Sequence, residues 1–312
     1  MRAVVVDPHA PGRLALSDVD QPVPAPSEAL VRVAAISLNR GELRAASTAE
    51  AGWRPGWDLA GTVEQQAADG SGPTEGSRVV GFVDSGAWAE LVAVPTNRLA
   101  ELPDAVSFAQ AATLPVAGLT ALRVLERGGS LLSRTVLVTG ASGGVGHFAC
   151  QLARLSGARV VGVVRQAASE AAVRDAGAHE VVVGQDLSGA EAFGPYHLIA
   201  ESVGGQSLAQ ALTMLAQDGV CVVFGATGGT ESTIDVRKFY NTGGASVYGF
   251  TIFHEHKRNP VARDLSRLAQ LVAEGRLRAP IEVEAPWSEV GTIAQQLMDR
   301  RFTGKAVLHI SE

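Results

Sequence analysis

Residues 135–165 read TVLVTGASGGVGHFACQLARLSGARVVGVVR, and this stretch decides the fold. Residues 135–139 form an apolar run without a polar face, which is typical of a parallel strand covered on both sides. The glycine-rich turn that follows leads into apolar residues at helical spacing, and Gly157 is a natural end for that helix. Residues 159–164 are a second apolar run. The stretch therefore predicts a strand, a glycine turn, a helix and a second parallel strand.

The glycine turn predicts a dinucleotide site. Glycines let the backbone bend tightly and approach a ligand, and the N–H groups at a helix start bind pyrophosphate. Ordinary tight turns also need glycines, but this one lies inside a strand-helix-strand unit of about 30 residues, the expected length. The pattern departs from G-x-G-x-x-G only at Ala141, and Gly143 and Gly146 stay in register. The backbone N–H groups expected to meet the pyrophosphate are those of Ser142, Gly143, Gly144 and Val145.

The end of the second strand indicates which dinucleotide binds. Proteins that bind NAD usually place Asp or Glu there for the ribose hydroxyls, whereas this chain reads Val163-Val164-Arg165-Gln166. An arginine beside the adenosine ribose favours a 2′-phosphate through charge-assisted hydrogen bonds. We therefore expect NADPH. The alternative is that Arg165 is only a solvated charge at a strand end.

Length and composition describe a globular protein of one large or two ordinary domains. Of the 312 residues, 46% are hydrophobic and 19% charged, and no apolar run reaches the ~18 residues that a membrane span needs. The net charge of −6 argues against nucleic acid or an anionic membrane as a partner. The first residues, MRAVVVDPHAPGRLALSD, lack the features of a secretory signal. Two cysteines without ligand-spaced neighbours, Cys150 and Cys221, fit a reducing cytoplasmic setting.

Residues 1 to about 100 predict an all-β unit. Short runs of strand-forming residues are separated by turns at regular intervals, which is typical of a partly open β-barrel. The predicted strands are residues 2–6, 14–17, 29–37, 59–65, 78–82 and 87–94. Helical segments over residues 107–127, broken at Pro115 and Gly118, then lead into the parallel sheet.

The α/β alternation continues after Arg165 and completes a doubly wound parallel sheet of six strands. Its further elements are predicted as helix 169–175, strand 180–183, strand 197–200, helix 206–215, strand 220–224 and strand 245–250. A tail follows, with helix 260–274, strand 281–283, helix 288–300 and strand 306–310. Because the tail is too short to be a domain alone, we expect it to pack on the β unit. Residues 1–114 and 256–312 would then form one domain and residues 115–255 the other.

Several motifs in order carry a resemblance to a known superfamily. They are Asn39-Arg40-Gly41-Glu42, residues 56–63 (GWDLAGTV), 86–90 (GAWAE), 111–121 (AATLPVAGLTA), the glycine turn, and the ending 304–308 (GKAVL). The chain resembles the medium-chain dehydrogenase/reductase superfamily, and within it the zinc-free quinone oxidoreductase branch, the relatives of zeta-crystallin. The resemblance implies a GroES-like catalytic domain, a Rossmann domain and a homodimer. The dimer would form through the edge strand of the Rossmann sheet, here residues 245–250.

The resemblance also bears on metal binding. Zinc-dependent members carry Cys and His in the two early motifs, where this chain has Asn39 and Trp57, and four closely spaced cysteines, whereas no cysteine here precedes Cys150. Neither metal site can be built, so we expect no metal and no zinc alcohol dehydrogenase. Without a zinc Lewis acid, a conjugated carbonyl is an easier hydride acceptor than a simple ketone, because hydride can add at the far carbon while the developing charge spreads to the oxygen.

The family's motifs assign candidate catalytic residues. Asn39 matches an asparagine near the nicotinamide and would donate a hydrogen bond to the substrate oxygen or the cofactor ribose; alternatively it is a turn residue. Glu42 and Asp58 fall where the family often has acidic residues, with structural hydrogen bonding as the alternative. Trp57 would wall the pocket or pack in the core. Enoyl-thioester reductases among the relatives use a tyrosine of the catalytic domain as proton donor. The only tyrosines here lie late, at 196, 240 and 248, so the resemblance makes water the simpler proton source.

The family positions also extend the cofactor site beyond the glycine turn. Loops 43–54 and 251–259 would line an apolar substrate pocket. The additional residues expected to contact NADPH are Thr120, Val203, Gly204, Phe224, Gly225 and Phe250.

The expected function is zinc-independent, NADPH-dependent reduction of a small electrophile, either a quinone or an α,β-unsaturated carbonyl. The alternative is an NADPH-binding structural or regulatory protein without redox turnover, which the lack of an obvious acid or base residue would suit.

Overall fold

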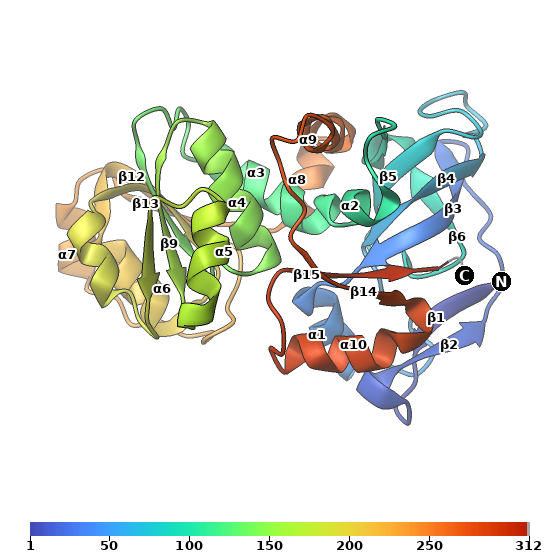
Figure 1. The fold of residues 1–312 in the computed structure, drawn as a ribbon, viewed down its shortest axis with the longest axis horizontal. Helices are drawn as coiled ribbons and strands as arrows, with labels where there is room; N and C mark the ends of the chain where they lie inside the picture. The colour runs from blue at the N-terminus through green and yellow to red at the C-terminus, as the bar shows by residue number, and fades with distance from the viewer. Residues whose placement is uncertain (311–312) are drawn as a thin grey trace. The chain divides into compact units, whose positions relative to one another are not determined.

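The computed structural model describes residues 1–310 (Figure 1). The chain forms two compact units: unit 1 comprises Met1–Leu119 and the segment that begins at His256, and unit 2 comprises Thr120–Glu255. The first boundary lies at Leu119 rather than at residue 114, because a π-helical turn, Leu114–Gly118, packs with unit 1. Within this turn Val116 N–H donates to Asp58 Oδ1 at 2.9 Å. No helix within residues 1–310 has the length and apolarity to cross a membrane.

Unit 2 is built on a six-stranded parallel sheet, as predicted. The strand order is β10-β9-β8-β11-β12-β13, with helices beside the sheet (Figure 1). The strands are β8 (Thr135–Thr139), β9 (Arg159–Val164), β10 (Glu180–Val183), β11 (Tyr196–Glu201), β12 (Leu215–Val223) and β13 (Ser246–Gly249). The helices are α3 (Leu119–Glu126), whose first residue still belongs to unit 1, α4 (Gly144–Leu155), α5 (Glu170–Asp175), α6 (Gly205–Thr213) and α7 (Val236–Asn241). This arrangement confirms the predicted Rossmann fold.

Burial explains why the first strands of unit 2 could be predicted from sequence. Val136, Leu137 and Val138 of β8 are fully buried, so both faces of the strand are covered. Later elements differ from the prediction in their bounds: β12 begins at Leu215 rather than at residue 220, and α7 was not predicted. Residues 251–259, expected to be a loop, mostly form α8 (Ile252–Arg258).

Unit 1 is a mostly antiparallel, partly open barrel, which confirms the predicted GroES-like architecture. Its seven-stranded sheet has the order β14-β15-β3-β4-β5-β7, and β6 also pairs with β3. A separate hairpin joins β1 and β2. The strands are β1 (Arg2–Val6), β2 (Leu14–Asp18), β3 (Glu28–Ser37), β4 (Asp58–Gln65), β5 (Arg78–Phe82), β6 (Leu91–Pro95), β7 (Leu99–Glu101), β14 (Ile281–Pro286) and β15 (Lys305–His309).

The C-terminal segment completes unit 1, as expected. β15 pairs antiparallel with β3, so the strand formed last in the chain lies beside the longest strand of the barrel (Figure 1). The barrel core, which includes Ile36, Leu59 and Trp88, also takes up Ile293 and Leu308 from this segment. The helices of unit 1 are α1 (Arg40–Thr48), α2 (Phe108–Ala112), α9 (Ala262–Ala273) and α10 (Val290–Met298).

Three predictions for unit 1 are wrong in detail. The strand expected over residues 87–94 begins only at Leu91, because the preceding residues pair with β1 instead: Val4 N–H donates to Trp88 O, and Ala89 bridges Ala3. Residues 43–54, expected to be a loop, begin inside α1. The three-residue strand β7 was not predicted.

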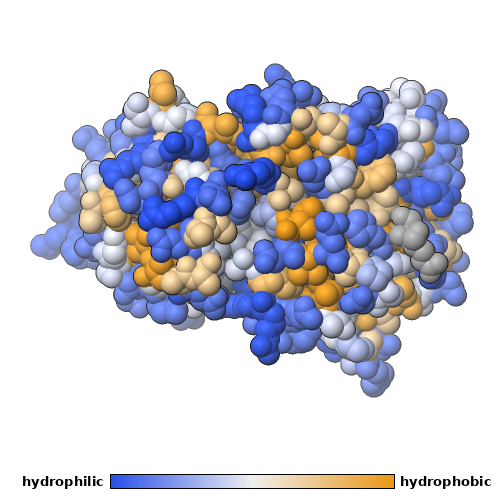
Figure 2. Space-filling model, in the orientation of Figure 1, coloured by the Kyte–Doolittle hydropathy of each residue, from blue (hydrophilic) through white to orange (hydrophobic). Residues whose placement is uncertain are grey.

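Figure 2 shows mostly hydrophilic residues on the face in view, with smaller apolar patches on each unit.

Candidate functional site

Three predicted catalytic residues come together inside unit 1 in a buried polar cluster. The strands β15, β3 and β4 are neighbours in that order, and the cluster lies where β3 ends and the other two begin. Their register pairs Ser37 with Asp58, which brings the Asp58 carboxylate beside the chain leaving β3. Lys305, the first residue of β15, is only 3% exposed. The polar cluster consists of Ser37, Asn39, Glu42, Asp58 and Lys305.

The hydrogen bonds of the polar cluster converge on the Asn39 carboxamide. Its Nδ2 donates to Glu42 Oε1 at 3.1 Å and to Asp58 Oδ2 at 2.8 Å, and its Oδ1 accepts from Lys305 Nζ at 2.6 Å. Reversing the amide would turn its oxygen towards two carboxyl groups and its hydrogens towards an ammonium, so the surrounding charges fix its orientation. Both amide hydrogens are engaged inside the protein. The predicted hydrogen bond from Asn39 to a substrate oxygen would require one of these contacts to break.

The local structure around Asn39 explains why it stands there. Asn39 precedes the first turn of α1 with extended backbone angles, φ −125° and ψ 144°. Its backbone N–H donates to Glu42 Oε1 at 2.6 Å, which satisfies a donor at the helix start. Asn39 and Glu42 therefore also have the structural roles that the sequence left open as alternatives.

Burial dominates the electrostatics of the polar cluster. Burial raises the pKa of the Glu42 carboxyl well above its ordinary value, and the nearby Asp58 raises it further. Burial also lowers the pKa of the Lys305 ammonium, against the opposing effect of Asp58 and Glu42. Glu42 Oε2 is buried and has no hydrogen-bond partner within residues 1–310. The cluster therefore favours a protonated Glu42 beside an ion pair in which Lys305 Nζ lies 3.4 Å from Asp58 Oδ2.

Trp57 packs against the start of α1. A Cβ built at Gly41 would lie 2.6 Å from Trp57 Cη2, so the indole occupies the space that any larger side chain at position 41 would need. Trp57 is only half-buried. The packing role left open for it is thus present in the structure, and its role as a pocket wall stays a prediction.

The glycine turn of unit 2 has the geometry of a tight strand-to-helix connection. Gly140 has φ +60°, in the left-handed region that favours glycine. A Cβ at Gly146 would lie 2.4 Å from Gly140 O, so only glycine lets α4 approach the turn this closely. The first intrahelical hydrogen bond runs from His147 N–H to Gly143 O at 2.8 Å, which leaves Gly144 and Val145 among the first donors of α4.

One expected donor of the glycine turn is engaged elsewhere. Gly143 N–H donates to Gly140 O at 3.0 Å and thereby closes the turn, so its predicted contact with pyrophosphate would compete with this bond. Contacts of the other residues, Ser142, Gly144 and Val145, stay predictions. Arg165 follows β9 directly, is exposed and forms no ion pair within residues 1–310. Its guanidinium is thus accessible to an anionic group.

The other predicted cofactor residues lie at or near the carboxyl ends of β11, β12 and β13, with one on α3. Val203 and Gly204 follow β11, and their backbone N–H groups donate to the buried carboxylate of Glu201 at 3.0 and 2.9 Å. Phe224 and Gly225 follow β12. Phe250 follows β13, and Thr120 is on α3; both are 6% exposed.

Two residues that sequence reasoning missed organise these regions. Lys305 stands directly before an apolar strand and Glu201 directly after one, and both are almost fully buried. A charged residue at the end of an apolar strand hints at a buried polar site in both cases. Local sequence does not predict the burial of either side chain, because that burial depends on partners far away in the sequence.

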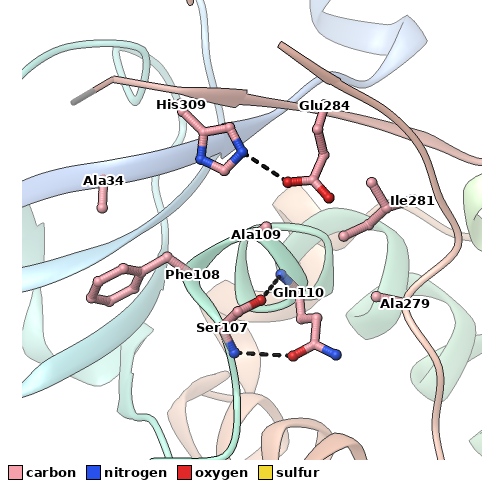
Figure 3. A pocket seen from close by; sticks show the side chains of 9 residues that line it. All are labelled: Ala34, Ser107, Phe108, Ala109, Gln110, Ala279, Ile281, Glu284 and His309. Carbon is pink, nitrogen blue, oxygen red and sulfur yellow. Dashed lines mark hydrogen bonds and ion pairs between the residues drawn. The ribbon is translucent and has the colours of Figure 1, made fainter. Parts of the chain in front are cut away.

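Unit 1 also contains a separate hollow between α2 and the strands β14 and β15 (Figure 3). At the rim of the hollow, His309 Nε2 lies 2.8 Å from Glu284 Oε2. On the opposite side, the backbone N–H of Ser107 donates a hydrogen bond to the Gln110 side chain, and the backbone N–H of Gln110 donates one to the Ser107 side chain. None of the predicted catalytic residues lines this hollow. Its lining consists of Ala34, Ser107, Phe108, Ala109, Gln110, Ala279, Ile281, Glu284 and His309. Across residues 1–310, no three or more His, Cys, Asp or Glu side chains gather in a group that could hold a metal ion.

Similarity to known proteins agrees with this architecture. The family model for the alcohol dehydrogenase GroES-like domain matches residues 25–104, and the model for zinc-binding dehydrogenases matches residues 144–270. Quinone oxidoreductases of Pongo abelii and Homo sapiens are each 30% identical to this chain over 255 residues, which is 77% of the chain and 76% of each relative.

Solved structures show the same fold over the whole chain. The Escherichia coli quinone oxidoreductase complexed with NADPH has a TM-score of 0.87 at 24% identity, covering 99% of this chain and 100% of the other. A mycobacterial protein complexed with NADPH has a TM-score of 0.88 at 26% identity, with the same coverage. The two-unit fold and the relatives that share it together show that the chain belongs to the medium-chain dehydrogenase/reductase superfamily, in its quinone oxidoreductase branch.

Proposed function

We propose that this protein is an NADPH-dependent oxidoreductase that delivers hydride to a quinone or an α,β-unsaturated carbonyl without zinc. The observation that carries the proposal is the glycine turn of unit 2, set between β8 and α4 in a parallel sheet of dinucleotide-binding order. Family membership and the NADPH complexes of two structural neighbours support it.

The chain's own residues fit NADPH. Gly146 permits the close approach of α4, and Gly144 and Val145 supply backbone donors for the pyrophosphate. Arg165, exposed at the end of β9, would bind the 2′-phosphate. Bound NADPH would supply the hydride, and the protein's part is to hold and orient the dinucleotide and to exclude water.

The residues at the family's zinc positions do not fit zinc. Asn39 and Trp57 stand where zinc-dependent members have Cys and His, and the Asn39 oxygen already accepts from the Lys305 ammonium at 2.6 Å. A second cation at that oxygen would be repelled by the ammonium. The proposed reaction is therefore one that needs no Lewis acid, because a quinone or enone spreads the developing charge itself. The proton would come from water.

The test is a titration of the full-length protein with NADPH and with NADH, followed by mixing with 1,4-benzoquinone and with a simple enone. We expect tighter binding of NADPH and rapid loss of nicotinamide absorbance at 340 nm when an electrophile is added, roughly at the 1–10³ s⁻¹ turnover typical of enzymes. Binding without oxidation by any electrophile would contradict the redox function. Equal affinity for NADH would contradict the role of Arg165.

One observation favours a second candidate, a cofactor-binding protein without redox turnover. Both amide hydrogens of Asn39 are engaged within the polar cluster, so the residue expected to assist catalysis has no unused donor. The same titration separates the two candidates, because only the reductase consumes NADPH.

We also propose that two copies associate through the edge strand β13, in a reducing cytoplasmic setting. Val247 on β13 is 46% exposed, and Val236 and Tyr240 on α7 are 60% and 62% exposed, so apolar side chains that a partner copy could cover are present on these two elements. Val247→Asp should halve the molecular mass of the protein measured by sedimentation; an unchanged mass would contradict this interface.

The cysteines support the proposed reducing setting. Cys150 and Cys221 are free and buried, and burial raises the pKa of the Cys150 thiol to about 12.

A further inference from the structure

A buried carboxylate lies at the point where the strand order of unit 2 reverses. Glu201 ends β11, which is paired with β8, and its side chain is fully buried. From β8 the chain builds β9 and β10 on one side, and later β11, β12 and β13 on the other. In sheets of this kind the dinucleotide binds in the crevice at this reversal, beyond the carboxyl ends of the strands.

Within residues 1–310, every hydrogen-bond donor to the Glu201 carboxylate is neutral. Oε1 accepts from Val203 N–H at 3.0 Å and from Ser207 Oγ at 2.9 Å, and Thr139 Oγ1 lies 3.3 Å from both Oε1 and Ala200 O, between which its one hydrogen is shared. Oε2 accepts from Gly204 N–H at 2.9 Å. We call Thr139, Glu201, Val203, Gly204 and Ser207 the Glu201 network.

The Glu201 network joins the two segments that flank the crevice. Thr139 is the last residue of β8 and directly precedes Gly140, which begins the glycine turn. Thr139 Oγ1 accepts from Ser202 N–H at 2.9 Å, and Ser202 Oγ donates to Thr139 O at 3.1 Å. The turn that meets pyrophosphate and the loop that follows β11 are thus fixed to each other.

A third segment depends on the same loop. After β12, Phe224 N–H donates to Glu201 O at 2.9 Å, and Thr227 N–H donates to Ser202 O at 3.2 Å. Gly204 has φ +73°, and a Cβ there would lie 2.2 Å from Gly229 O, so the two loops approach as closely as glycine allows. The conformation of loop 202–205 therefore decides where the loop after β12 lies.

We propose that Glu201 is a positioning residue for NADPH, because its carboxylate holds loop 202–205 against the glycine turn and so fixes the crevice that takes the dinucleotide. This inference rests on the proposed cofactor. Glu201 itself is fully buried and acts through the backbone of Val203 and Gly204.

The test compares NADPH affinity among full-length variants by nicotinamide fluorescence. In Glu201→Gln, the amide oxygen can keep the three donors at Oε1, but the amide nitrogen faces the Gly204 N–H, which must move. We expect the Kd for NADPH and the KM for NADPH to rise about tenfold, which corresponds to about 1.4 kcal/mol, while kcat and the KM for the quinone change by less than about twofold. Ser207→Ala removes one donor and should raise the Kd about threefold.

The matched control is Tyr196→Phe, at the opposite end of the same strand. Tyr196 is fully buried and its hydroxyl donates to Ala190 O at 2.6 Å, so its loss also removes a buried hydrogen bond from unit 2. This variant should lose thermal stability yet keep its Kd within about twofold of the wild-type value.

Three outcomes separate the possibilities. A wild-type protein that binds neither NADPH nor NADH overturns the proposed function, and this inference with it. A wild-type protein that binds NADPH, with an unchanged Kd in Glu201→Gln or an equal rise in Tyr196→Phe, overturns the positioning role alone. If Glu201→Gln does not fold, Ser207→Ala decides: a raised Kd supports the role and an unchanged one overturns it.

Discussion

The polar cluster of unit 1 and the Glu201 network of unit 2 both bury a carboxyl group at a strand end, Asp58 and Glu201, but they stabilise it differently. In the polar cluster the Lys305 ammonium pairs with Asp58 alone, and Glu42 Oε2 has no hydrogen-bond partner within residues 1–310. In the Glu201 network, one carboxylate accepts hydrogen bonds from two backbone N–H groups and the Ser207 hydroxyl, and it shares the hydrogen of the Thr139 hydroxyl with Ala200 O. The stability of the polar cluster therefore depends on pH and on a charge, Lys305, that lies far away in the sequence. The stability of the Glu201 network depends instead on the conformation of the local backbone.

The largest effect should follow from removing the ammonium of the polar cluster. Lys305→Met leaves Asp58 buried without its counter-ion, and breaking a buried pair in this way typically costs about 3–5 kcal/mol. All four tryptophans, Trp53, Trp57, Trp88 and Trp287, lie in unit 1, so tryptophan fluorescence during urea unfolding reports on this unit.

The matched control for this substitution is Lys257→Met, which removes an exposed lysine of the same unit. It should change the stability by less than about 0.5 kcal/mol. A similarly small effect of Lys305→Met would show that the polar cluster does not depend on its cation.

The next effect concerns backbone shape in unit 2. Gly146→Ala places a Cβ 2.4 Å from Gly140 O and 2.7 Å from Ala141 Cα, and such overpacking typically costs about 1–3 kcal/mol. Because unit 2 has no tryptophan, far-UV circular dichroism is the suitable measurement. In Gly143→Ala the nearest atom would be 3.3 Å away, so this variant should lose much less stability. Equal losses in the two variants would refute the close-approach explanation.

A third effect tests whether Glu42 of the polar cluster is protonated in the folded protein. Because the pKa of Glu42 is raised in the folded protein, its stabilisation is full below the ordinary value of 4.5 and is lost as pH rises towards the raised value. In Glu42→Gln, which resembles the protonated carboxyl, this loss is absent. The wild-type stability should therefore fall relative to the variant by up to about 1.4 kcal/mol per pH unit above pH 4.5.

Glu64 gives a control of opposite sign for this pH dependence. Its pKa is lowered by the hydrogen bond from Arg32, so its small contribution is present at neutral pH and is lost as pH falls. Urea unfolding of Glu42→Gln and Glu64→Gln, from well below pH 4.5 up to about pH 8, measures both effects. A difference between wild type and Glu42→Gln that does not vary with pH would mean that Glu42 is not protonated in the folded protein.

The smallest effect concerns the exposed charge beside the crevice. Arg165→Ala should weaken NADPH binding about fivefold, or roughly 1 kcal/mol, because the exposed guanidinium is screened by solvent. NADH binding should stay the same, since NADH has no 2′-phosphate. Titrations at low salt give the measurement, and equal weakening for both dinucleotides would remove Arg165 from the 2′-phosphate site.

The sequence predicted regular elements well and their long-range partners poorly. The bounds of β8 and β9 are confirmed because both strands are apolar on both faces and are followed by a glycine turn or a charge. α1 was missed because its sequence, RGELRAAST, contains an early glycine and few apolar residues. It forms in the fold because Leu43 and Ala46 pack into the barrel core.

The candidate site shows the same division. The motifs located Asn39, Glu42 and Asp58, and the structure brings these residues together. Lys305 could not be placed beside them from local patterns, because its contact with Asn39 spans 266 residues. The hydrogen bond from the Asn39 amide to Asp58 was equally beyond a motif, since it depends on the pairing of β3 with β4.

That span also has a consequence for biosynthesis. At roughly 5–20 residues per second, a ribosome makes Lys305 on the order of 10–50 s after Asn39, and unit 2 is completed in between. During this interval β3 lacks its neighbour β15, and Asp58 lacks its counter-ion Lys305. The sheet of unit 1 therefore has an unpaired edge at β3 until β15 is synthesised. Unpaired sheet edges of this kind are sites where chaperones bind and aggregation begins.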